Sequence, residues 1–281
     1  MKKKNSEITA VIPTYTNISG LRKLILTLSS MGIPSIIVDN QPTQEKEDMA
    51  KKYSAIYLPQ LTNRGFGFAV NRGVERVNSQ WIVILNDDIE IQDKRLFERM
   101  LDYAEKNNFI AVSPVLKKPN GNVENLGYKV LPFGRVELIK DVTQNELDGL
   151  TAACLLIKKA VFSSIGGFDE RFFAYLEDVD LFLKLKRRGE KFGICLEEEA
   201  IHNHMTTSSR MGNFKEMQDV KNWYLVIFNN WNAKTMIKHF PSILLERIRN
   251  LSGLVKKTVK VYMIQFHKFR LNRNKKYEHR L

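Results

Sequence analysis

The stretch Trp81-Ile82-Val83-Ile84-Leu85-Asn86-Asp87-Asp88-Ile89-Glu90-Ile91 decides the fold. An unbroken apolar run that ends in Asn-Asp-Asp is typical of a strand buried on both faces of a parallel sheet. Such a strand places its polar residues at the carboxyl edge of the sheet, where open α/β sheets bind their ligands. The same residues could instead cap a following helix, and the motif alone does not separate these two interpretations.

A second acidic cluster, Glu177-Asp178-Val179-Asp180, lies far downstream and favours the functional interpretation. Apolar residues recur at helical spacing after this cluster, and Gly189 ends the pattern. We therefore expect a helix from Glu177 to Arg188 with the acidic side chains on its first turn. Two clusters of this kind can face each other across one pocket.

Strands and helices alternate through the first part of the chain, which predicts right-handed crossovers and a parallel sheet. Pro13 is expected to end the first strand. The pattern turns irregular after the fifth strand, where turns are predicted at 119–121 and 133–134. The predicted strands are residues 8–12, 35–40, 55–58, 81–85, 109–114 and 150–157.

The basic charge is concentrated near the C-terminus. The chain of 281 residues has a formal net charge of +13. The segment from Lys234 onward holds 13 Lys or Arg and two acidic residues, so it contributes +11 and leaves the rest of the chain nearly neutral. We expect a catalytic domain at 1–231 and a separate basic region at 232–281.

This basic region predicts an amphipathic helix, which is typical of an element that lies on an anionic membrane surface. The alternative is a helix that packs on the catalytic domain or on a second subunit, giving an oligomer. The apolar residues at three- and four-residue steps are Leu244, Ile248, Leu251, Val255, Val259, Tyr262, Phe266 and Phe269. The basic residues on the remaining surface are Arg247, Lys256, Lys257, Lys260, Lys268 and Arg270.

Neither a disulfide nor a membrane span is expected. Cys154 and Cys195 lie in apolar surroundings without metal-ligand spacing, as reduced thiols of a cytoplasmic protein do. The N-terminus lacks the apolar segment of a signal peptide, and no apolar run approaches the roughly 18–20 residues of a span. We therefore expect a cytoplasmic protein, peripheral at the inner face of the cell membrane.

A series of motifs in order resembles the family 2 glycosyltransferases, and most of all their rhamnosyltransferase-type branch. Each motif is weak alone, but their order from about Ile8 to Arg210 is a strong signal. The resemblance implies a GT-A fold, which is a mixed, Rossmann-like α/β sheet flanked by helices. The motifs are Val11-Ile12-Pro13-Thr14-Tyr15, Ile37-Val38-Asp39-Asn40, Asn63-Arg64-Gly65-Phe66-Gly67, Ile84-Leu85-Asn86-Asp87-Asp88, Gly166-Gly167-Phe168-Asp169-Glu170-Arg171-Phe172-Phe173 and Glu177-Asp178-Val179-Asp180-Leu181.

The resemblance also implies a nucleotide-sugar donor and a divalent metal, Mg²⁺ or Mn²⁺. Asp88 is the expected metal ligand, and His202 or His204 would complete the coordination, with the choice between them open. Asn86 or Asp87 would contact the ribose or a metal-bound water. The residues expected near the nucleotide are Pro13, Tyr15, Asp39, Asn63, Arg64, Gly65, Asn71, Asn86 and Asp87.

Asp178 is, by resemblance, the base that takes the proton of the acceptor hydroxyl. Its neighbours can raise its pKa by like-charge repulsion, whereas the helix N-terminus stabilises the anion. Glu177 and Asp180 are candidates for acceptor binding in the same catalytic cluster. The alternative for both is a structural role on the first turn of the helix.

The leading hypothesis is a metal-dependent inverting glycosyltransferase that uses a dTDP- or UDP-sugar. Rhamnose is favoured only through the resemblance, and the expected acceptor is a polyprenyl-diphosphate-linked or cell-surface glycan. A nucleotidyltransferase should have a glycine-rich, basic phosphate loop, which Pro13-Thr14-Tyr15-Thr16 is not. A nucleic-acid-binding protein is the third possibility, but basic charge confined to a helix with an aromatic stripe argues against it.

Overall fold

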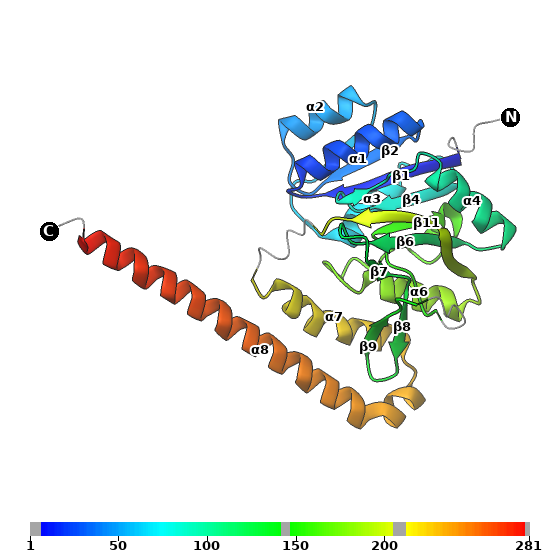
Figure 1. Cartoon of the computed structure of the whole chain (residues 1–281). Helices are drawn as coiled ribbons and strands as arrows, with labels where there is room; N and C mark the ends of the chain where they lie inside the picture. Colours follow the sequence, from blue (N-terminus) through cyan, green and yellow to red (C-terminus); the bar gives the residue numbers. More distant parts are fainter. Residues whose placement is uncertain (1–6, 142–146, 205–211, 279–281) are drawn as a thin grey trace.

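The computed structural model of the chain describes residues 7–141, 147–204 and 212–278, and a mixed sheet of nine strands dominates this part (Figure 1). In sheet order the strands are β3 (Ile56–Pro59), β2 (Ser35–Asp39), β1 (Ile8–Thr14), β4 (Trp81–Leu85), β10 (Cys154–Lys158), β6 (Ala111–Lys117), β11 (Phe192–His202) and β5 (Ile89–Glu90). The strand β7 (Val123–Asn125) pairs with β6, and β8 (Tyr128–Leu131) forms a separate hairpin with β9 (Arg135–Leu138).

The direction of the strands confirms the predicted mixed α/β sheet. The strands from β3 to β4 are parallel, as the alternating sequence pattern predicts. By contrast, β10 runs antiparallel to both β4 and β6, and β5 runs antiparallel to β11. The end of β11 therefore lies beside Ile89, which brings the residues after β11 to the residues after β4.

Strand β4 is buried on both faces, as its apolar run predicts. Trp81, Val83 and Leu85 belong to one core layer, and Ile82 and Ile84 belong to the other. The helices of the first layer are α1 (Ile18–Met31), α2 (Gln44–Lys52) and α4 (Leu96–Lys106). The helices of the second layer are α3 (Phe66–Val74), α5 (Lys159–Ser164) and α6 (Glu177–Arg187).

The prediction that Pro13 ends the first strand is wrong. Strand β1 continues to Thr14 and stays in register with β2 over Pro13. Ala10 donates its N–H toward the β2 side, to Pro34, so the N–H position of Pro13 faces the β4 side. The β1–β4 pairing ends at Val11, so the missing N–H of Pro13 breaks no ladder bond.

Two helices follow the sheet. Helix α7 (Phe214–Asn230) packs on the domain. Helix α8 (Ala233–Glu278) runs back along α7 and continues past it (Figure 1). Asn213, just before α7, donates to the hydroxyl of Thr258 in α8 at 2.6 Å. None of the described helices combines the length and hydropathy that a bilayer span requires. Cys154 and Cys195 are free and buried, as expected.

The predicted amphipathic helix exists, but Arg247 is not on its basic surface. Its side chain is 7% exposed, lies with the guanidinium carbon 5.1 Å from the Trp223 ring centroid and donates to the carbonyl of Gly134. The side chains of Phe266, Lys268, Phe269 and Arg270 lie outside the described residues. The apolar residues left 49–68% exposed are Leu244, Ile248, Leu251, Val255, Val259 and Tyr262.

Candidate active site

Asp88 and His202 face each other where β4 and β11 end. Asp88 is 6% exposed, and its Oδ1 lies 3.3 Å from Nε2 of His202. Neither of these buried atoms makes a hydrogen bond with any described residue. Asn203 holds the two chain segments together by donating its backbone N–H and its side-chain amide to the Asp88 carbonyl, at 3.0 and 3.2 Å. A carboxylate oxygen and an imidazole nitrogen left open in this way fit a divalent cation.

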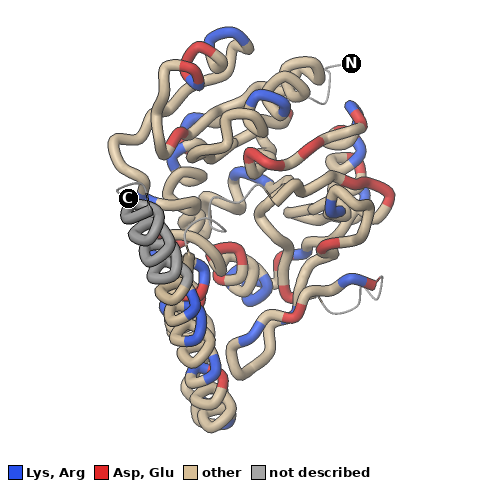
Figure 2. Tube along the Cα trace, turned by 60° about the vertical axis from the view of Figure 1, so that its left-hand side comes forward, with Lys and Arg blue, Asp and Glu red and all other residues tan. Residues whose placement is uncertain are grey.

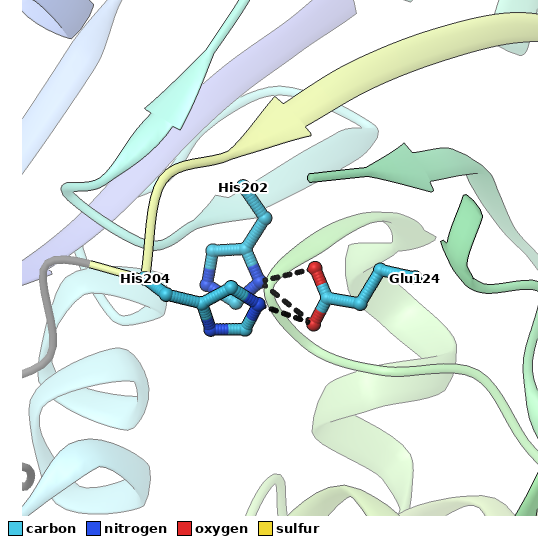
Figure 3. Close-up of side chains that lie close together, drawn as sticks. All are labelled: Glu124, His202 and His204. Carbon is cyan, nitrogen blue, oxygen red and sulfur yellow. Dashed lines mark hydrogen bonds and ion pairs between the residues drawn. The ribbon is translucent and has the colours of Figure 1, made fainter. Parts of the chain in front are cut away.

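Glu124 of β7 faces both histidines (Figure 3). One of its oxygens lies 3.2 Å from Nδ1 of His202, and the other lies 2.9 Å from Nε2 of His204. Burial alone would lower the pKa of His202, but the carboxylates of Asp88 and Glu124 outweigh it and raise this pKa to about 9. Glu124 is not among the site residues predicted from the sequence, because an isolated glutamate in an irregular stretch forms no motif.

Asp87 holds the loop that follows β1. Its carboxylate accepts a hydrogen bond from the hydroxyl of Thr14 at 2.6 Å and from the side-chain amide of Asn17 at 3.2 Å. Burial raises the pKa of Asp87 to about 6, against the hydrogen bond from Thr14. Gly20 is required beside this contact, since a Cβ there would lie 2.3 Å from the Asp87 carbonyl oxygen. The predicted contact of Asp87 with ribose or water stays a prediction.

The two acidic clusters meet the same short segment of backbone. Ala152 directs its N–H toward Oδ2 of Asp178 at 3.4 Å. Asn86 donates its N–H to the carbonyl of Ala153, the residue after Ala152, at 2.9 Å. Asp178 and the end of β4 are therefore separated by one stretch of main chain, although they are far apart in sequence.

Asp178 and Glu177 begin α6 with raised pKa values. Burial raises the pKa of Asp178 to about 6, against the N–H of Val179, which donates to Oδ1 at 2.8 Å. Burial and then the charge of Asp178 raise the pKa of Glu177 to about 8. Oε2 of Glu177 is also buried without a hydrogen-bond partner in the described part of the chain. A carboxylate that titrates near neutral pH suits a general base.

Asp180 lies on the same turn, but its carboxylate is bound by the protein. Its exposed fraction is 1%. Oδ1 accepts hydrogen bonds from the amides of Asn229 and Asn230 at 2.9 and 2.8 Å, and Oδ2 pairs with Nζ of Lys184 at 2.5 Å. These contacts connect α6 to the end of α7. The geometry supports the structural alternative for Asp180 and gives no support to its predicted catalytic role.

The turn before α6 has an unusual backbone that a side chain from α7 holds. Tyr175 and Leu176 both have left-handed φ values, 69° and 67°. Asn222, which is 0% exposed, donates to the carbonyls of Ala174 and Tyr175 at 2.7 Å each. Consecutive left-handed residues other than glycine are strained and need such support. Asn222 therefore fixes the entry to the helix that begins with Glu177.

Asp39, one of the residues predicted near the nucleotide, is 0% exposed at the end of β2. Nζ of Lys46 and the hydroxyl of Tyr57 each lie 2.7 Å from its carboxylate, and the N–H of Gln41 donates to it at 3.0 Å. Lys46 also donates to the carbonyl of Tyr15 at 2.5 Å. Protein groups thus bind both oxygens of Asp39, and contact with a base would require one of them to move.

The glycine-rich segment at Gly65 is bound to the loop of residues 166–173. Gly65 has a φ of 95°, and a Cβ there would lie 2.0 Å from the Phe173 carbonyl oxygen. The amide of Asn71 donates to the Phe168 carbonyl at 2.8 Å and accepts from the Phe168 N–H at 3.0 Å. Asn71, predicted near the nucleotide, is therefore engaged with backbone.

Arg64 remains the accessible cation of this segment. Its side chain is 57% exposed, with the guanidinium carbon 3.7 Å from the Phe68 ring centroid and one nitrogen 3.5 Å from Glu170. Asn63 orients the turn, because its side-chain oxygen accepts the N–H of Gly65 at 2.9 Å. A guanidinium placed in this way can bind a diphosphate.

Residues 9–166 match the model of the family described as Glycosyl transferase family 2. The chain belongs to this family. It is therefore a glycosyltransferase, and the nucleotidyltransferase alternative is not supported. The "Low-salt glycan biosynthesis hexosyltransferase Agl10" of Haloferax volcanii is 22% identical over an alignment of 231 residues that covers 78% of this chain and 75% of that one.

An L-rhamnosyltransferase is among the relatives of this glycosyltransferase, in agreement with the predicted branch. The "N-acetylglucosaminyl-diphospho-decaprenol L-rhamnosyltransferase" of Mycobacterium tuberculosis is 25% identical over 245 residues, covering 72% of this chain and 79% of the relative. The mannosyltransferase PcManGT from Pyrobaculum calidifontis, solved with GDP-Man and Mn²⁺, has a TM-score of 0.61 at 13% identity, covering 92% of this chain and 75% of that one. The latter likeness confirms the predicted GT-A fold.

Proposed function

We propose that this glycosyltransferase moves a sugar from a nucleotide-diphosphate donor to a hydroxyl of a glycan acceptor, with a divalent metal and with inversion at the anomeric carbon. The observation that carries the proposal is that the backbone of residues 152–153 contacts both acidic clusters. Ala153 accepts the N–H of Asn86, two residues before Asp88, and Ala152 directs its N–H toward the carboxylate of Asp178. The carboxylate of Asp88 suits a divalent cation, and the carboxylate of Asp178 suits a proton.

Asp178 is the proton acceptor in this mechanism. Its carboxylate takes the proton of the acceptor hydroxyl as that oxygen bonds to the anomeric carbon and the bond to the diphosphate breaks. Inversion requires the attacking oxygen and the leaving diphosphate to lie on opposite faces of the sugar, as in the single displacement of inverting glycoside hydrolysis. The N–H groups of Val179 and Ala152 orient the carboxylate.

Asp88 and His202 would hold the metal, Mg²⁺ or Mn²⁺, through the atoms Oδ1 and Nε2. When bound, such a cation neutralises the negative charge that develops on the diphosphate. Arg64 can add positive charge at the same leaving group, since its side chain is exposed. These are the binding and charge-stabilising parts of the reaction, separate from proton transfer at Asp178.

The donor and acceptor are proposed by analogy with the relatives. The mycobacterial relative is named for L-rhamnosyl transfer to a diphospho-decaprenol-linked sugar. This name favours a dTDP- or UDP-sugar as donor, rhamnose as the transferred sugar, and a polyprenyl-diphosphate-linked or cell-surface glycan as acceptor. We infer a role in the synthesis of cell-envelope glycans. A solved structure of Staphylococcus aureus TarS contains UDP. At 12% identity and a TM-score of 0.57, this likeness supports the fold and not the choice of nucleotide.

Thermal-shift measurements with a panel of UDP-, dTDP- and GDP-sugars test the donor class. A true donor stabilises the folded protein by mass action, by about 2.7 kcal/mol at 100 times its Kd, and Mn²⁺ should strengthen this effect. NMR of the product formed from the best donor then gives the anomeric configuration. Retention of configuration, or stabilisation by no donor in the panel, would contradict the proposed reaction.

We further propose that the region from 232 onward serves the lipid-linked acceptor by binding an anionic membrane surface. Lys and Arg recur along α8 (Figure 2), and its apolar stripe is exposed. Anionic headgroups attract basic residues by about 1 kcal/mol each near the surface, screened by salt. The proposed location of the enzyme is therefore the inner face of the membrane. The alternative occupant of the stripe is a second copy of the chain.

Vesicle co-sedimentation with phosphatidylglycerol tests this assignment. Point variants are better than truncation before Ile243, because truncation removes Arg247 from its packing against Trp223. The double variant Val255→Ser/Val259→Ser should weaken vesicle binding and leave transfer to a soluble acceptor intact. Vesicle binding that is unchanged in the double variant would favour a second copy of the chain as the occupant of the stripe. A wild-type dimer that dissociates in the double variant would favour it as well.

A further inference from the structure

Glu124 lies at a break in the strand pairing next to the histidines. Leu116 of β6 pairs with Asn125, whereas the next residue, Lys117, pairs with Val123. The register therefore shifts by one residue and leaves Glu124 as the extra residue of a β-bulge. Bulges redirect side chains and are frequent beside active sites. The side chain of Glu124 points at His202 and His204 (Figure 3).

The two ring nitrogens of His202 have different surroundings. Nδ1 lies within hydrogen-bonding distance of both Glu124 oxygens, at 3.2 and 3.3 Å. Nε2 faces Oδ1 of Asp88 at 3.3 Å without a hydrogen bond among the described residues. An imidazole whose Nδ1–H is donated to a carboxylate presents the lone pair of Nε2 to a metal, with its ring orientation fixed.

His204 contacts Glu124 and the ring of His202 from the more exposed side of the cluster. Its Nε2 lies 2.9 Å from Glu124, its side chain is 43% exposed, and its ring centroid is 4.1 Å from that of His202. Glu124, His202 and His204 could also bind a cation directly, because their ligand atoms lie within 4.8 Å of one another. The open atoms, however, are on Asp88 and on Nε2 of His202, and the atoms around Glu124 already have partners.

We propose that Glu124 is a positioning residue for the metal: it accepts Nδ1–H of His202 and thereby aims Nε2 at the cation held with Asp88. His204 braces Glu124 from the other side and is not a ligand. The inference rests on the proposed metal-dependent function, and it extends that function to a residue outside the motifs. Loss of such a supporting carboxylate typically reduces metal affinity by about 10–100-fold.

The test is a Mn²⁺ titration followed by the EPR signal of free Mn²⁺, with the full chain alone and with UDP, dTDP or GDP. Glu124→Ala should weaken Mn²⁺ binding by about 10–100-fold. Glu124→Gln keeps an oxygen that can accept Nδ1–H and should restore part of the affinity. The exposed Glu137 of β9 provides the matched control Glu137→Ala, and thermal melting checks that each variant is folded.

Each outcome separates the inference from the proposed function. If the wild-type protein binds no Mn²⁺ in any condition, both the metal dependence of the proposed function and this inference are wrong. Wild-type binding with an unchanged Glu124→Ala variant overturns only the inference. A loss in His204→Ala as large as in Glu124→Ala, together with an unaffected Asp88→Asn, would show that the three residues bind the cation directly. Electron spin echo modulation from a single imidazole nitrogen in wild type supports the proposed arrangement.

Discussion

Strands β2 and β4 end in the same way in sequence but in opposite ways in structure. Each strand is entirely buried and leads to a buried aspartate: Asp39 is the last residue of β2, and Asp88 follows β4 after Asn86 and Asp87. Lys46 and Tyr57 bind the carboxylate of Asp39, whereas Oδ1 of Asp88 makes no hydrogen bond within the described residues and lies 3.3 Å from Nε2 of His202. A buried carboxylate with protein partners stabilises the fold, and one without them is available to a ligand.

The first turn of α6 repeats this contrast within three residues. Asp180 is bound by Lys184 and two asparagines, whereas in the described part of the chain Asp178 is held by backbone N–H groups alone and has a raised pKa. We therefore distinguish occupied carboxylates, Asp39 and Asp180, from open carboxylates, Asp88 and Asp178. Substitution of the first kind should affect stability, and substitution of the second kind should affect catalysis.

The largest effect is expected for Asp88→Ala. Loss of a metal ligand removes several kcal/mol of charge stabilisation, so kcat/KM should fall by at least about 10³-fold. Donor binding that depends on Mn²⁺ should disappear in isothermal titration calorimetry, while the melting temperature without metal stays close to that of wild type. Metal-dependent donor binding that survives in Asp88→Ala would show that Asp88 is not the open carboxylate that binds the metal.

Asp178→Asn should reduce kcat by about 10²–10⁴-fold, because an amide cannot take the proton of the acceptor hydroxyl. The donor Kd, measured by the same calorimetry, should remain within a small factor of wild type. The neighbouring variant Asp180→Asn should instead lower the melting temperature, since Lys184 loses its charged partner. Near-normal transfer by Asp178→Asn would show that the base lies elsewhere.

Asp39→Asn should destabilise the protein by about 3–5 kcal/mol, because it leaves the buried ammonium of Lys46 without its counter-charge. Urea denaturation of the metal-free protein measures this loss. Under conditions where the variant is folded, its Mn²⁺ affinity should match wild type. A stable variant with weakened nucleotide binding would instead support the predicted position of Asp39 near the nucleotide.

Asn222→Ala should act on the turn before Asp178. It removes the hydrogen bonds to the carbonyls of Ala174 and Tyr175, at a cost of about 0.5–1.5 kcal/mol each, and releases the left-handed backbone at Tyr175 and Leu176. Misplacement of the base should lower kcat by about 10–10²-fold with little change in the donor KM. Steady-state kinetics separates the two constants, and equal losses in both would indicate general unfolding instead.

The smallest effect is expected in the pH profile. The active form of Asp178 is the carboxylate, and burial raises its pKa to about 6. Activity should therefore fall as the pH drops through about 6, by about tenfold for each further unit. The charges of Glu177 and Asp178 repel each other, so this fall in activity reports the protonation of the pair. A profile at saturating Mn²⁺ and donor that stays flat down to pH 4.5 would contradict the raised pKa.

Local patterns in the sequence predicted most of the fold. The run from Trp81 to Leu85 predicts a strand buried on both faces because each of its side chains is apolar, and the structure has that strand. The end of β1 was missed because Pro13 is tolerated only where a neighbouring strand has stopped, which is a tertiary fact. Arg247 was misplaced for the same reason, since Trp223 and Gly134 lie far from it in sequence.

The sequence by itself determined the layered α/β sheet, the family motifs and the positions of the acidic residues at strand and helix ends. These follow from periodicity and from short motifs, which are local properties of the chain. Only the tertiary structure decided which acidic residues are open, because Lys46, Asn229 and Asn230 approach Asp39 and Asp180 from other elements. It also placed Glu124 against His202, since a β-bulge and a distant strand end meet there through packing that no local pattern specifies.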